Sequence, residues 1–151
     1  MKLVEALGSA GEEVLREASG ALGRAHLKHY EMTEPEESDR RLKELLALIV
    51  ECIAGRTLVP VCHYTETVAR ERFAAGFDIG EVQTTFNVLE EAIWHVVVLR
   101  LPPAEVAEAA GLVGTIVGTG KDTLARTWVS LATSQHVPTL DLTALFQGAG
   151  G

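Results

Sequence analysis

The histidines are the residues of this chain that are best able to bind a metal ion or a haem iron. His26 and His29 lie three residues apart, so a helix would place both rings on one side. His63 lies beside a cysteine, and His95 lies in the apolar segment 92–101. None of His29, His63 and His95 has a glutamate three positions before it, as a di-iron centre of the ferritin type requires. We therefore expect no metal and no cofactor; a haem- or metal-binding helical sensor that uses His29, His63 or His95 is the alternative.

A glycine-rich segment, residues 114–123, is similar to a phosphate-binding loop in composition but not in spacing. A P-loop has a glycine five positions before its Gly-Lys pair and a serine or threonine directly after the lysine. Here these two positions carry Thr115 and Asp122, and no apolar strand precedes them. No nucleophile elbow and no cysteine–histidine couple is found elsewhere in the sequence. We therefore expect a protein that is not an enzyme.

Arg72 and Glu90 are charged residues at positions where the helical pattern favours apolar ones. With a rotation of about 100° per residue, each falls on the side of its helix that carries the aliphatic residues. Because a lone buried charge is costly, we predict that the two side chains meet across the turn at Gly76. In the other interpretation, both aliphatic stems lie at the edge of the core and both charged groups are in water. A small-molecule enzyme built around this pair is a third interpretation.

Helical periodicity predicts the elements that must position these residues. Glycine and proline divide the chain into segments whose apolar residues recur with helical rather than strand spacing. Asp78, with Glu81 three residues later, predicts an N-cap and a capping box. Gly120 lies on an apolar face and predicts the close approach of a neighbouring helix or a small ligand. We expect one all-α domain over residues 1–151, a globin-like bundle of five or six main helices with its core at about 12–147. The expected helices are 12–30, 38–55, 60–75, 78–101 and 104 or 112 to 134. A final turn is expected at 141–146.

The C-terminal part of the 78–101 helix is apolar on nearly every side. Val97 faces one way, whereas His95, Val98 and Leu99 face the other. A helix with apolar residues all round is covered on both sides. Either this helix lies at the centre of the domain, or His95, Val98 and Leu99 contact a second subunit in a homodimer.

Composition and charge narrow the classes of partner. The 151 residues include 21 acidic and 13 basic ones, and the resulting net charge of −8 argues against binding to a nucleic-acid backbone. No apolar run approaches the roughly 18 residues that a membrane helix requires. The first residues lack the apolar stretch of a signal peptide, and two cysteines do not make a disulfide framework. We expect a cytoplasmic protein with no nucleic-acid and no membrane partner.

Three segments of the chain are similar to one known family. Residues 71–94, with the sequence ERFAAGFDIGEVQTTFNVLEEAIW, form the longest of them, and residues 120–132 and 140–146 extend the likeness. Together they resemble the N-terminal domain of the RsbT co-antagonist proteins, which belong to stressosome-type signalling systems.

The resemblance implies a helical, globin-like sensory domain without haem that dimerises and takes part in stress-response signal transduction. It also implies a STAS-domain protein or a serine kinase as the regulatory partner. The positions that match the family motif are carried over as ligand-binding or structural-sensing residues, namely Arg72, Gly76, Glu81, Asn87, Glu90 and Trp94.

Overall fold

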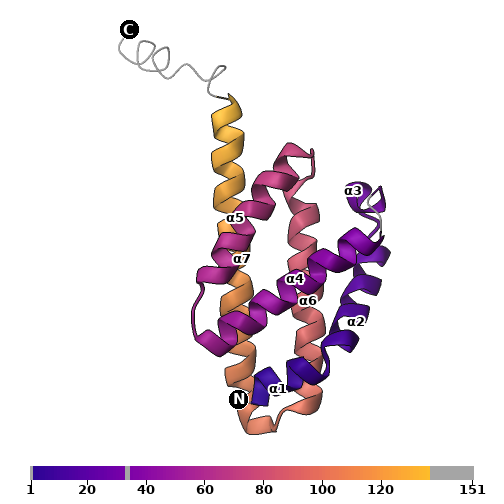
Figure 1. Cartoon of the computed structure of the whole chain (residues 1–151), viewed down its shortest axis with the longest axis vertical. Coiled ribbons are helices and arrows are strands. Elements are labelled where there is room, and N and C mark those ends of the chain that lie inside the picture. The colour runs from indigo at the N-terminus through magenta and orange to yellow at the C-terminus, as the bar shows by residue number, and fades with distance from the viewer. Residues whose placement is uncertain (1, 33–34, 137–151) are drawn as a thin grey trace.

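The chain folds into a bundle of α-helices (Figure 1). The computed structural model describes residues 2–32 and 35–136, and within these ranges it contains seven helices and no strand. The expected all-α, single-domain architecture is thereby confirmed. The helices are α1 (Lys2–Ser9), α2 (Gly11–Arg24), α3 (Lys28–Glu31), α4 (Pro35–Gly55), α5 (Val59–Ala74), α6 (Ile79–Arg100) and α7 (Pro103–His136).

Helices α6 and α7 form the centre of the bundle. They are joined by a tight corner at residues 101–102 and run in opposite directions (Figure 1). Helix α2 packs against α6, α5 packs against α7, and α4 crosses the bundle to contact α2, α5 and α7. One hydrophobic core fills the space between them. Its largest fully buried side chains include Leu7, Leu42, Leu45, Ile49, Ile53, Leu89, Ile93, Ile116 and Leu124.

The corner between α5 and α6 is formed as its local sequence predicts. Gly76 has a φ of +85°, a conformation that glycine adopts without steric cost. Asp78 is the N-cap of α6, and its Oδ1 accepts a hydrogen bond of 2.9 Å from the N–H of Gly80. Glu81 completes the capping box, because its Oε1 accepts a hydrogen bond of 3.0 Å from the N–H of Asp78.

The N-terminal third of the chain differs from the prediction. The single helix expected at 12–30 is divided into α2 and α3 by a break at His26, whose φ of 51° lies in the left-handed region. An additional helix, α1, precedes them and buries Leu3 and Leu7 in the common core. The core therefore begins before residue 12. The reason is that a helix of eight residues gains its stability from tertiary packing rather than from its own sequence.

Helix α7 is longer than predicted. It runs without a break over 34 residues and includes both of the expected starting points at 104 and 112. Helix α4 also begins earlier than expected, with Glu36 and Glu37 in its first turn. The final turn expected at 141–146 lies outside the described residues. No helix in the described ranges combines the length and the apolar character that a membrane crossing requires.

Gly120 marks the closest contact of α7 with its neighbours, as its place on the apolar face predicts. A Cβ atom at this position would lie 2.8 Å from Cε1 of Phe86 and 3.3 Å from Cγ2 of Val61. Both side chains are buried, so neither has space to move away. By contrast, a Cβ at Gly111 of the same helix would meet nothing within 4 Å.

This contrast predicts opposite effects of one substitution at two positions of α7. We expect Gly120→Ala to lower the free energy of unfolding by about 1–2 kcal/mol, because the added methyl group overpacks the core against Phe86. We expect Gly111→Ala to raise it by about 0.4–1 kcal/mol, because alanine favours the helix and the space is open. Urea unfolding of the two variants measures both values, and a neutral or stabilising Gly120→Ala would contradict the close contact.

Candidate functional site

Several of the motif positions meet at the corner where α3 contacts the start of α6. The backbone N–H of His29 donates a hydrogen bond of 2.9 Å to Oε2 of Glu81. The ring Nδ1 of His29 lies 2.6 Å from Oε1 of the same carboxylate. An ionised carboxylate only accepts hydrogen bonds, so Nδ1 carries the hydrogen. Glu81 is 8% exposed, and it joins α3 to the capping box of α6 across 52 residues of sequence.

The environment of Glu81 favours its ionised form. Burial of the carboxyl group opposes ionisation, but the N–H groups of Asp78 and His29 and the His29 ring outweigh burial. They hold the pKa of Glu81 below its ordinary value of 4.5. At neutral pH the corner therefore contains a buried carboxylate whose negative charge is satisfied by donors from two elements.

Phe77 is the aromatic centre of the same corner. The ring of His29 lies 4.9 Å from the ring of Phe77, and the guanidinium carbon of Arg72 lies 4.6 Å from its centroid. Arg72 is 8% exposed, and a ring face in this position attracts its positive charge. Gly76 lies directly beside this group, since a Cβ there would be 3.9 Å from Nε2 of His29. We call His29, Arg72, Gly76, Phe77 and Glu81 the corner cluster.

The prediction that Arg72 and Glu90 meet is wrong. Glu90 lies 3.7 Å from Nζ of Lys121 in α7 and has a quarter of its side chain exposed. Helical rotation gives the side on which a residue lies, but not its height along the axis. Arg72 is near the corner, whereas Glu90 is eleven residues beyond the start of α6, about 16 Å along the helix. The interpretation as an enzyme around this pair therefore has no geometric basis.

The histidines lie in separate places and have different partners. His26 pairs with Glu31 at 2.9 Å, and the ring of His95 forms a short hydrogen bond with Glu17 of α2. His63 is exposed on α5. Within residues 2–32 and 35–136, no three histidine, cysteine, aspartate or glutamate side chains are grouped in a way that could hold a metal ion.

The outer face of α6 carries apolar side chains that the domain does not cover. Trp94 is 42% exposed, Val98 57% and Leu99 79%, whereas neighbouring Val97 is buried. Central burial of this face, one of the two options that the sequence leaves open, is therefore wrong for the single chain. Asn87, two turns before Trp94, is exposed as well. We call Trp94, Val98 and Leu99 the outer apolar face.

Comparison of the chain with models of protein families, with curated proteins and with solved structures finds no match. Only some residues of the corner cluster can be predicted from the sequence. Gly76 and Glu81 have local signals, a turn and a capping box, and Arg72 is a charged residue on an apolar face. The contact of His29 with Glu81 and the role of Phe77 have no local signal, because they join segments that are far apart in the sequence.

The corner cluster predicts a pH-dependent effect of Glu81→Gln. The pKa of Glu81 is lowered in the folded state, so its charge stabilises the fold above pH 4.5, and this contribution is lost as the pH falls through the lowered value. We expect Glu81→Gln to reduce the free energy of unfolding by about 1–3 kcal/mol at pH 7 and by less at pH 3, which is below the ordinary pKa of the group. Urea unfolding at the two pH values measures the difference.

Glu91→Gln is the matched control, because Glu91 is an exposed carboxylate of the same helix. We expect it to change stability by no more than about 0.5 kcal/mol at either pH. An effect of Glu81→Gln that stays the same from pH 7 to pH 3 would show that the charge of Glu81 is not what holds the corner.

The pairing of Glu90 with Lys121 predicts that replacement of Glu90 lowers the stability only slightly, whereas replacement of a residue in a buried ion pair would lower it strongly. Both side chains are partly exposed, and pairs of this kind contribute about 0–1 kcal/mol. We therefore expect Glu90→Gln to lower the free energy of unfolding by less than about 1 kcal/mol. Thermal unfolding of this variant measures the change, and a loss of several kcal/mol would argue for a buried ion pair instead.

Proposed function

We propose that this chain is a non-catalytic sensory or regulatory domain that acts through protein–protein contacts and forms a homodimer. The observation that carries the proposal is the outer apolar face of α6, which stays exposed in a bundle whose other large apolar side chains are mostly buried. Exposed apolar side chains grouped near one end of a helix are typical of an interaction site. The enrichment of tryptophan at protein interfaces supports the same interpretation.

The neighbouring edge of α7 supports a close approach of a second helix. The Glu90–Lys121 ion pair shows which residues of α6 and α7 lie at the same level along the two helices. Trp94 lies one turn after Glu90, while Gly118 and Gly114 lie one and two turns before Lys121. Because the two helices run in opposite directions, Gly118 is about level with Trp94 along the helix axis and Gly114 is about level with Val98.

The two glycines have no packing role inside the domain. A Cβ at Gly114 or Gly118 would meet nothing within 4 Å. Each glycine in a helix interior costs about 1 kcal/mol relative to alanine. A partner helix that lies close to the α7 backbone would explain both of them, in the way that Phe86 explains Gly120. A second copy of the chain supplies such a helix, and two copies of one face make a symmetric interface.

The resemblance to the N-terminal domain of the RsbT co-antagonist proteins agrees with this proposal. It implies a globin-like sensory fold without haem, a dimer, and a STAS-domain protein or a serine kinase as the partner. The motif residues fall into two groups in this chain: Arg72, Gly76 and Glu81 belong to the corner cluster, while Glu90 and Trp94 lie towards the outer face.

Helix α6 connects the two groups. It has 22 residues and is therefore about 33 Å long, with Glu81 in its first turn and the outer apolar face near its other end. A change in the corner cluster that tilts or shifts α6 would alter the position of Trp94 and Val98. Regulation would then consist of a shift between two packing arrangements of this helix, each favoured by a different partner or ligand.

The proposal predicts that charge on the outer apolar face separates the dimer. We expect the wild-type chain to sediment as a dimer and the double variant Trp94→Glu/Val98→Glu to sediment as a monomer, because four carboxylates would face each other across the symmetry axis. Analytical ultracentrifugation over a range of concentrations measures the change, and circular dichroism checks that the variant keeps its helices.

Val59→Glu is the matched control, since Val59 is 59% exposed but lies at the start of α5. We expect this variant to remain a dimer. A wild-type chain that stays monomeric at high concentration contradicts the homodimer. A double variant that still dimerises contradicts the assignment of the dimer interface to the outer apolar face.

A further inference from the structure

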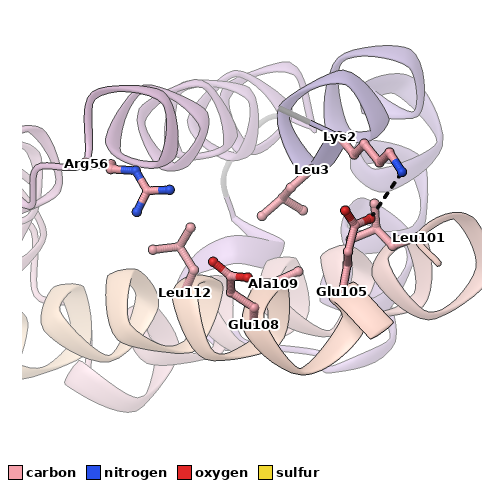
Figure 2. Close-up of a pocket in the computed structure, with 8 residues that line it drawn as sticks. All are labelled: Lys2, Leu3, Arg56, Leu101, Glu105, Glu108, Ala109 and Leu112. Carbon is pink, nitrogen blue, oxygen red and sulfur yellow. Dashed lines mark ion pairs between the residues drawn. The ribbon is translucent and has the colours of Figure 1, made fainter. Parts of the chain in front are cut away.

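A small pocket lies where α1, the end of α4 and the start of α7 meet, at the end of α6 opposite to the corner cluster (Figures 1 and 2). It has a volume of about 90 Å³. Leu3, Leu101 and Ala109 line it, and all three are less than 10% exposed, so its floor is apolar. Charged side chains surround this floor on two sides.

Arg56 is the cation on one wall of the pocket. It follows the last residue of α4, and its φ of 49° lies in the left-handed region. This conformation is strained for a non-glycine residue, whereas glycine would adopt it freely. Attraction to the C-terminus of α4 does not require the strain, because an arginine one turn earlier would gain the same interaction. The guanidinium forms no ion pair with any residue of the described ranges and points into the pocket (Figure 2).

Two carboxylates of α7 face the pocket from the opposite wall. Glu108 points toward the pocket and, in the described part of the chain, has no hydrogen bond or ion pair (Figure 2). Oε2 of Glu105 is buried and accepts no hydrogen bond. Its nearest cation is Nζ of Lys2 at 3.8 Å, which is an ion-pair distance but too long for a hydrogen bond. A buried acceptor without a donor is destabilising.

The pocket therefore offers donors on one wall, acceptors on the other, and an apolar floor between them. We infer that it binds a small zwitterion of the α-amino-acid class with a short aliphatic side chain. The ligand carboxylate would pair with the guanidinium of Arg56, in the bidentate manner that this group favours. The ligand ammonium would donate to Glu108, and its side chain would cover Leu3 and Ala109.

Charge balance favours a zwitterion over a simple anion or cation. Lys2 and Arg56 contribute two positive charges, and Glu105 and Glu108 contribute two negative ones. A carboxylate without an ammonium group would satisfy Arg56 but would lie close to Glu108, whereas an amine without a carboxylate would leave Arg56 unpaired. The inference goes beyond the proposed function and does not depend on it, since ligand binding and dimerisation are measured separately.

The test is a titration of the whole chain with L-valine, followed by calorimetry and by amide NMR shifts. We expect saturable binding with a Kd no weaker than about 10 mM, with the largest shifts in α1 and at the start of α7. Isovalerate is valine without its ammonium group and isobutylamine is valine without its carboxylate, and we expect each to bind at least about tenfold more weakly.

Two variants and two controls assign the binding to this pocket. Arg56→Gln and Glu108→Gln should each weaken L-valine binding by about tenfold or more, because each removes one charge-assisted contact. Arg70→Gln and Glu51→Gln change exposed residues of α5 and α4 in the same chemical way and should leave the affinity unchanged. Circular dichroism confirms that each variant is folded.

Three results would overturn the inference: no saturation by L-valine, equal binding of the two singly charged analogues, or an affinity that Arg56→Gln and Glu108→Gln leave unchanged. None of them bears on the dimer. Conversely, a monomeric chain that binds L-valine through Arg56 would support the pocket and contradict the homodimer.

Discussion

The carboxylate of Glu81 accepts hydrogen bonds from His29 and from Asp78, which are 49 residues apart in the sequence. It closes the N-terminus of α6 and at the same time attaches α3 to it. Because α6 packs against both α2 and α7, the position at which α6 begins determines where the rest of the core lies. A buried charge is tolerated here because the His29 ring and the N–H groups of His29 and Asp78 all contact it, and removal of one of these donors would weaken that compensation.

The sequence predicts those parts of the structure that depend on residues within one or two turns of each other. The capping box of Asp78 and Glu81 and the turn at Gly76 are examples, and both are confirmed. Gly120 is a further case, because a glycine on an apolar stripe indicates that another helix lies close. The all-α class is predictable for the same reason, since helical periodicity is a local pattern.

The features that the sequence does not predict depend on how far along a helix axis a residue lies, or on contacts between segments that are distant in the sequence. Arg72 is buried and Glu90 is partly buried, as their helical positions predict, but Glu90 lies too far along α6 from the corner at Arg72 for the two to pair. Helix α1 is not predicted from the sequence, because its stability comes from the burial of Leu3 and Leu7 in the shared core. The pocket beside Arg56 is composed of three elements, and no short segment of the sequence contains a sign of it.

Several features at helix α6 lower the stability of the isolated domain, and a bundle selected for stability alone would avoid them. Trp94, Val98 and Leu99 expose apolar surface on it, and Gly114 and Gly118 weaken α7 beside it at about 1 kcal/mol each. A domain of this size has a total stability of only about 5–15 kcal/mol, so these losses are a substantial part of it. They would be offset if the exposed residues are buried and the glycines are approached closely in an assembly. The same reasoning applies to the strained backbone of Arg56, whose cost would be offset if a ligand carboxylate pairs with its guanidinium. The proposed dimer and the proposed ligand would each account for one of these costs.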